Sequence, residues 1–392
     1  MTAADRLLAL HRTLRAAPPH DIVHALARVL ADRFRVTSCT LLLADYAVSS
    51  LRPFGREATE DSVVPVVGTP AGRAFVAQEP VVVTDGHPGA EETLYLPVSA
   101  RGDRIGVLRI GYPEQGAKPS VAELSEAAEA LAHEILAAAP ATDVYRQSRR
   151  LRRLTLAAEM QWDLLPGHSC ERPEFILGAQ LEPAYSVRGD NFDWSVSADT
   201  LTVSVTNGMG HGVQAATLTA LAVGALRNAR RSGADLALQA ELASQAVWSV
   251  HTGSAYLASV LLEIDLASGE VDGIDAGSPV VMLLRQGRVE RVDLEAQFAL
   301  GMLEDTRYVP ERFTLEAGDR LLVVSDGVHG FRSHTGEIFG ERQLAVVMRD
   351  NRLAPAPEAA RAVLRELARF RGDNQADDDA VALCLDWRGR DT

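Results

Sequence analysis

The sequence predicts an α+β protein of two domains, each of which combines antiparallel strands with helices. Three observations predict this. A chain of 392 residues is longer than one hydrophobic core ordinarily serves. Short apolar runs alternate with longer stretches of helical periodicity along the whole chain. Hydrophobic side chains make up 47% of the residues and charged ones 23%, so more than one core can be buried.

Charge and cysteine content exclude several classes of protein. Acidic residues (53) outnumber basic ones (39), and the net charge of −14 argues against binding to nucleic acid or an anionic membrane. Cys39, Cys170 and Cys384 lie too far apart for a disulfide framework or a thiolate zinc site. The N-terminus lacks a secretory pattern, and the apolar run after Val213 is too short to span a bilayer. We expect a cytoplasmic protein.

The sequence of the N-terminal part predicts a helix, a group of strands and a second helix. Pro18 and Pro19 separate an opening helix, in segment 1–19, from an amphipathic helix that begins after Asp21. A stripe of apolar side chains over 121–138 predicts the closing helix. This predicts an α+β domain over residues 20–139. The strands are expected at 38–45, 63–67, 81–84, 93–100 and 105–111.

Residues 140–166 are predicted to form a connecting helix. Its first half is rich in arginine, and its second half is apolar. The arginines are consistent with a solvated helix face, or with a signalling linker that also holds a homodimer together. The sequence leaves both alternatives open.

The C-terminal part, residues 167–389, predicts two antiparallel sheets covered by helices, an αββα-type sandwich. Helices are expected at 213–231, 236–251 and 356–370. The strands are expected at 175–180, 194–196, 201–205, 256–265, 270–276, 280–285, 288–292, 313–315, 320–325 and 380–386.

Aspartate and glycine residues follow several of these strands, in four motifs. Oxygen ligands at strand ends and loops are what Mg²⁺ and Mn²⁺ prefer. Each motif alone is an ordinary turn or solvated loop. The motifs are RGDNFD at 188–193, TNGMGHG at 206–212, SDGV at 325–328 and DDDA at 377–380.

Residues 20–139 resemble a GAF domain. The resemblance is carried by GTPAGRAF at 68–75, QEPV at 78–81 and the hairpin that joins YLPV at 95–98 to GVL at 106–108. It implies a regulatory sensor that binds a small ligand or mediates dimerisation. Cys39 is interpreted as a core residue of a strand.

Residues 155–387 resemble the metal-dependent protein phosphatases, in the branch of the stage II sporulation protein E and the stress-response phosphatases. The order of the four motifs carries the resemblance, together with DAGSP at 275–279, LGM at 300–302 and FGER at 339–342. It implies a site that holds two Mn²⁺ or Mg²⁺ ions through the carboxylates of Asp190, Asp326 and Asp378 and the carbonyl of Gly208.

Asn207 departs from this pattern, because the family has a metal-bridging aspartate there. A neutral amide offers one oxygen acceptor in place of an anionic pair. Asp193 and Asp379 are the carboxylates that could substitute. Arg188, Ser278 and Gly330 are smaller departures. His211 fits either a general acid or a residue at the start of a helix.

Two functions remain open. The first is a serine/threonine phosphatase of signal transduction that acts on a phosphorylated anti-sigma factor antagonist under control of the GAF domain. The alternative is a pseudophosphatase that binds its phosphoprotein without hydrolysing it, because of Asn207. Both use Asp190, Asn207, Asp326 and Asp378 as the central residues.

Overall fold

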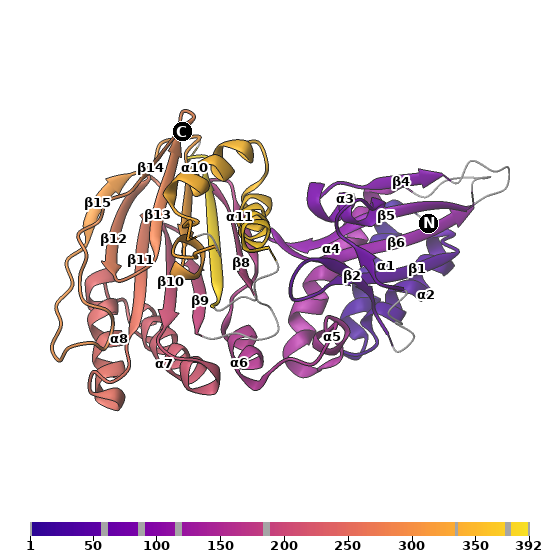
Figure 1. Ribbon diagram of the computed structural model, residues 1–392. Helices are drawn as coiled ribbons and strands as arrows, with labels where there is room; N and C mark the ends of the chain where they lie inside the picture. The colour runs from indigo at the N-terminus through magenta and orange to yellow at the C-terminus, as the bar shows by residue number, and fades with distance from the viewer. Residues whose placement is uncertain are drawn as a thin grey trace. The chain divides into compact units, whose positions relative to one another are not determined.

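The structure, a computed structural model, describes residues 2–55, 62–84, 91–113, 120–182, 189–333, 336–372 and 378–390. The chain divides into two compact units, Met1–Arg153 and Leu154–Thr392 (Figure 1). Both units mix helices with antiparallel sheet, which confirms the predicted α+β class. Among the described residues, no helix has the length and apolar character that crossing a membrane requires.

The N-terminal unit is built on a six-stranded sheet with the order β3-β2-β1-β6-β5-β4. Leu41 and Leu43 on β1 pack with helices α1, α2 and α4, whereas Leu42 and Ala44 pack with α3 on the other face. This alternation is the two-residue period of a strand buried on both sides. The elements are α1 (Ala3–Ala16), α2 (Ile22–Phe34), β1 (Ser38–Ala44), β2 (Ser50–Pro53), β3 (Val64–Pro65), α3 (Pro70–Ala77), β4 (Val81–Thr84), β5 (Glu91–Ala100), β6 (Asp103–Pro113) and α4 (Val121–Ala138).

The connecting segment corrects one prediction, since residues 140–166 do not form a single helix. A 3₁₀ turn (Ala139–Ala141) and α5 (Val144–Ser148) belong to the N-terminal unit, and α6 (Leu156–Leu164) begins the C-terminal one. Thr155 caps α6 by accepting a hydrogen bond from the Ala158 N–H at 3.2 Å. Arg149 donates to the Ala44 carbonyl at 2.9 Å and stacks on Tyr46. These contacts interrupt the helix.

The C-terminal unit is a sandwich of two antiparallel sheets, as predicted. The five-stranded sheet has the order β15-β12-β11-β10-β9 and packs against α7 and α8. The six-stranded sheet has the order β14-β13-β16-β17-β8-β7 and packs against α10 and α11 (Figure 1). The strands are β7 (Ser169–Arg172), β8 (Phe175–Glu182), β9 (Asp190–Val196), β10 (Thr200–Gly208), β11 (Leu257–Asp265), β12 (Glu270–Ala276), β13 (Val280–Arg285), β14 (Arg288–Arg291), β15 (Glu311–Thr314), β16 (Arg320–Val324) and β17 (Ala380–Trp387). The helices after α6 are α7 (Gly212–Arg231), α8 (Leu236–His251), α9 (Asp326–His329), α10 (Glu341–Asp350) and α11 (Ala356–Arg371).

Close packing of α11 on β8 gives a first testable prediction. A Cβ atom at Gly178 would lie 2.3 Å from the Pro357 Cα. We expect Gly178→Ala to lower the free energy of unfolding by about 1–3 kcal/mol through overpacking. Gly224→Ala, inside α7 where a Cβ would meet no described atom within 4 Å beyond its own helix and chain neighbours, is the control and is expected to be neutral or stabilising. Urea unfolding midpoints measure both, and equal midpoints would contradict the prediction.

Candidate metal centre

The start of β9 and the end of β10 lie side by side at one edge of the five-stranded sheet. The two strands pair so that Asn207 lies opposite Asp190. The Gly208 N–H donates to the Gly189 carbonyl at 3.2 Å just beyond this pair. A Cβ atom at Gly189 would lie 2.4 Å from the Gly208 carbonyl oxygen, so this close approach of the backbones needs a glycine. Two of the four motifs therefore meet here.

The end of β16 and the start of β17 are joined in a similar way. These are the two central strands of the six-stranded sheet. The Ser325 N–H donates to the Val381 carbonyl at 3.1 Å, and the Val381 N–H donates to the Ser325 hydroxyl oxygen at 2.9 Å. A Cβ atom at Gly327 would lie 1.7 Å from the Asp379 carbonyl oxygen. The glycine of the SDGV motif thus allows the acidic motif at β17 to pack directly against the one that follows β16.

Hydrogen bonds across the two sheets bring all four motifs together. The Asn207 side-chain amide donates to Oδ1 of Asp326. The buried Asp379 accepts through Oδ2 from the Gly189 N–H at 2.8 Å and from the Asp190 N–H at 3.3 Å. The carboxylates of Asp190 and Asp326 are therefore held at the facing ends of β9 and β16.

Asp190 lies in a strongly unfavourable environment for a negative charge. Its side chain is buried, and Oδ2 accepts no hydrogen bond from the described part of the chain. Burial raises the pKa of Asp190 well above its usual range, and the nearby charge of Asp379, with smaller contributions from Asp326 and Asp378, raises it further. A hydrogen bond with Ser325 opposes this shift. A bound cation would relieve the same repulsion.

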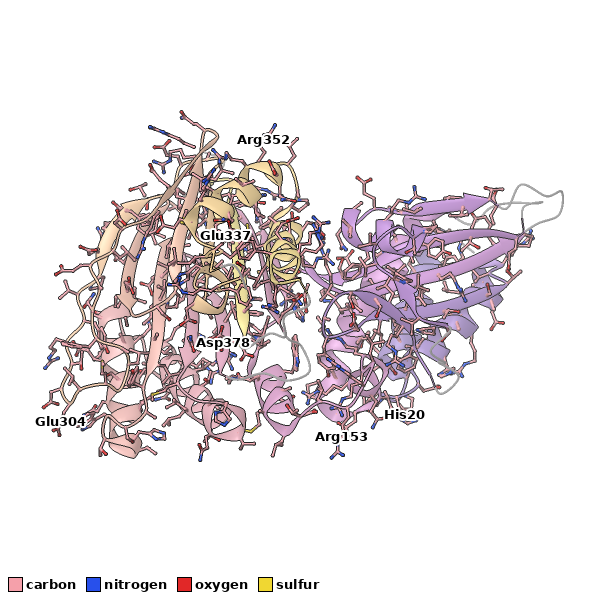
Figure 2. The ribbon with its side chains drawn as sticks, viewed as in Figure 1. His20, Arg153, Glu304, Glu337, Arg352 and Asp378 are labelled. Atoms are coloured by element: carbon pink, nitrogen blue, oxygen red, sulfur yellow. The ribbon has the colours of Figure 1, made fainter. Side chains whose placement is uncertain are left out.

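The structure brings together Asp190, Asn207, Gly208 and Asp326, and Asp378 lies near enough for its charge to raise the pKa of Asp190. Asp378, labelled in Figure 2, is exposed just before β17 and accepts a hydrogen bond from the Asp379 N–H at 2.9 Å. Asp377 and Arg188 lie outside the described residues. Across the described part of the chain, no group of three or more His, Cys, Asp or Glu side chains is arranged to hold a metal ion.

The two carboxylates that could have replaced the missing aspartate have other roles. Asp193 accepts from Arg227 at 2.8 and 3.1 Å and lies on the buried side of β9. Asp379 holds the peptide groups of Gly189 and Asp190. His211 is exposed at the N-cap position of α7 and makes no capping hydrogen bond through its side chain.

Sequence reasoning missed two hydroxyl groups at this site. The Ser325 hydroxyl lies beside the Asp190 carboxylate and lowers its pKa, and Thr219 on α7 donates to the Gly189 carbonyl at 2.7 Å. The signal for Thr219 is a hydroxyl within an otherwise apolar helical stripe, because such a group has to find a partner when it is buried. Ser325 was within a motif but had no assigned role.

The residues present fit a hard divalent cation. The site offers oxygen donors from carboxylates and from the backbone, which suit Mg²⁺ and Mn²⁺. Oδ2 of Asp190 lacks a hydrogen bond from any described residue, as expected of an oxygen kept for a ligand. Asn207 supplies less negative charge than a carboxylate, and its N–H now occupies an oxygen of Asp326. The donor set is therefore suitable but less anionic than it would be with aspartate.

Comparisons with known proteins relate the C-terminal unit to a known family. Residues 197–388 match the family model of the stage II sporulation protein E (SpoIIE). Protein IcfG of Synechocystis sp. is 25% identical over 222 residues, and the match spans 49% of this chain but about a third, 35%, of that protein.

Two solved structures share the fold. The RsbU and RsbW domains of Rv1364c from Mycobacterium tuberculosis align with a TM-score of 0.50 and 22% identity over 56% of this chain and 63% of that one. The SiaA-PP2C domain of Pseudomonas aeruginosa aligns with a TM-score of 0.50 and 24% identity over 60% of this chain and 94% of that one. The family match relates the C-terminal half of the chain to SpoIIE, and the two solved structures show that this half has a PP2C-like fold.

Proposed function

We propose that the protein is a metal-dependent phosphatase that removes phosphate from serine or threonine of a small regulatory protein, such as an anti-sigma factor antagonist. One observation carries the proposal: Asp190, Asn207 and Asp326 meet at the facing ends of two sheets in a SpoIIE/PP2C-like domain. The N-terminal unit, with its six-stranded sheet between helical layers, would be a GAF-type sensor that controls this activity, and a homodimer is part of the proposal.

The residues of the site would have different roles in binding the ions. Asp190, Asp326 and Asp378 would hold two Mn²⁺ or Mg²⁺ ions, with the carbonyl of Gly208 as a further donor. When bound, the ions would supply an activated water and neutralise the charge of the phosphoryl group. The Ser325 hydroxyl favours the charged form of the Asp190 carboxylate, since it lowers the pKa of that group. The peptide groups around Gly189 are fixed, so Asp190 needs little rearrangement to act as a ligand.

A second candidate function is phosphoprotein binding without hydrolysis. The observation that favours it is the hydrogen bond from the Asn207 amide to Asp326, which uses a carboxylate oxygen for a contact within the protein. To offer an oxygen to a cation, the amide of Asn207 would have to turn over and give up this bond. A weakened site of this kind could still attract a phosphoprotein while turning it over slowly or not at all.

Titration with Mn²⁺ distinguishes the two functions. The substrates are a phosphorylated antagonist protein and an aryl phosphate, and the measured quantity is phosphate released by wild type and by Asn207→Asp. We expect wild type to release phosphate in a way that EDTA abolishes. We expect Asn207→Asp to need about tenfold less Mn²⁺, because one more charge at ligand distance contributes on the order of 1.4 kcal/mol after desolvation.

Asn228→Asp is the matched control, because it makes the same chemical change at an exposed position of α7. It is expected to leave the Mn²⁺ requirement unchanged. Phosphate release by Asn207→Asp alone would establish the binding function for wild type. If neither protein released phosphate in Mn²⁺ or Mg²⁺, the phosphatase proposal would be wrong.

A further inference from the structure

The backbone of Gly189, immediately before Asp190, is held by three other elements of the C-terminal unit. Its N–H donates to Asp379 at the start of β17, at 2.8 Å. Its carbonyl accepts from the Thr219 hydroxyl on α7, at 2.7 Å, and from the Gly208 N–H at the end of β10, at 3.2 Å. We call these three contacts the Gly189 clamp. Both backbone hydrogen-bonding groups of Gly189 are therefore fixed from different sides.

The two side chains of the clamp, Thr219 and Asp379, are fully buried, so each of their polar groups needs a partner. Thr219 and Asp379 are both 0% exposed. Thr219 lies between Leu218 and Ala222 on a helix whose neighbouring side chains are apolar. A buried hydroxyl or carboxylate is costly unless it is hydrogen-bonded, and here both are bonded to the backbone of Gly189. Core packing alone would be served equally well by a valine at position 219.

Thr219 also contacts the second glycine of the site. A Cβ atom at Gly208 would lie 2.4 Å from the Thr219 Oγ1. One hydroxyl group thus rests against the backbone on both strands, beside Asp190 on β9 and beside Asn207 on β10. Because this oxygen contacts both Gly189 and Gly208, a shift of α7 would change the distance between the start of β9 and the end of β10.

We propose that Thr219 and Asp379 are positioning residues, which act through Gly189 to fix the Asp190 carboxylate and the Gly208 carbonyl relative to each other for a divalent cation. The inference rests on the proposed function in one respect only, that the site takes such a cation. Thr219 contributes through its hydrogen bond and Asp379 through its hydrogen bonds and its negative charge. Neither side chain has to touch the cation or the substrate.

Mn²⁺ affinity of the full chain, measured by isothermal titration calorimetry, tests this inference without turnover. We expect Thr219→Val, which keeps the side-chain shape but removes the hydroxyl, to weaken Mn²⁺ binding about five- to tenfold, as the loss of one buried hydrogen bond implies. Thr219→Ser keeps the hydroxyl and is expected to stay within about twofold of wild type. Thr217→Val is the matched control, because Thr217 is exposed on the same helix and bonds only locally, to the Val213 carbonyl.

A second measurement follows the clamp itself, in EDTA. Hydrogen exchange of the Gly189 amide should be faster in Asp379→Ala than in wild type, and it should stay slow in Thr217→Val. Unchanged exchange in Asp379→Ala, or wild-type Mn²⁺ affinity in Thr219→Val, would overturn the inference. If wild type binds Mn²⁺ but releases no phosphate, the proposed function fails, while a weaker affinity of Thr219→Val still supports the clamp.

Discussion

Asp326→Ala is expected to reduce Mn²⁺-dependent phosphate release about 10³-fold, the upper range for loss of one electrostatic group at a reaction centre. Asp326 follows β16 directly and faces Asn207 across the two sheets. Its removal takes away one of the two carboxylates that the structure holds at the facing strand ends. Initial rates at saturating Mn²⁺, for wild type and variant, measure the effect.

The fold should survive this substitution. Asp326 is among the charges that raise the pKa of Asp190, so its loss relieves repulsion between carboxylates. Thermal unfolding of metal-free Asp326→Ala is therefore expected at or above the wild-type temperature. Asp199→Ala, at the exposed turn between β9 and β10, is the control for loss of an aspartate and should keep full activity. Phosphate release within tenfold of wild type in Asp326→Ala would show that this carboxylate has no part in the reaction.

The largest effect on stability is expected for Arg227→Met. Arg227 donates to the Asp193 carboxylate at 2.8 and 3.1 Å and to the Leu164 carbonyl, at the end of α6, at 2.6 Å. The Asp193 side chain is 3% exposed. Removal of the guanidinium leaves a buried carboxylate with Arg230, at 3.5 Å, as its remaining cation. We expect the free energy of unfolding to fall by about 3–5 kcal/mol, as for other buried pairs that lose one partner.

Urea unfolding of a small set of variants tests this expectation. Arg227→Met combined with Asp193→Asn should recover part of the loss, because the unpaired charge is then removed as well. Arg312→Met is the control: Arg312 pairs with Asp272 at 2.8 Å, but both side chains are exposed. Its loss is expected to cost at most about 1 kcal/mol. Equal effects of Arg227→Met and Arg312→Met would contradict the prediction.

Much of the fold could be predicted from periodicity. Helices α4, α7, α8 and α11 each carry a long apolar stripe, and their bounds match the predicted ones within one residue. Helix α10 was missed because just three of its side chains are buried: Leu344, Val347 and Met348. Helix α6 was merged with the preceding segment, since the cap at Thr155 and the contacts of Arg149 with Ala44 and Tyr46 depend on the folded chain.

The site could be predicted in outline but not in its internal contacts. Consecutive aspartates at the start of a strand point to opposite faces, yet the sequence does not say which face is buried. The structure exposes Asp378 and buries Asp379. Arg227 shows the same limit, because its pairing with Asp193 joins residues that are 34 positions apart. Partners of this kind are set by the packing of α7 on β9, which no local pattern encodes.

In this site, the residues that allow close backbone packing differ from the residue that sets its charge. Backbone packs against backbone at Gly189 and Gly327, and these positions leave no room for a larger side chain. Asn207, by contrast, contributes an amide that is close in size to a carboxylate and is partly exposed. Because codons for asparagine and aspartate differ by a single base, one nucleotide substitution would change the charge of the site and leave its scaffold intact.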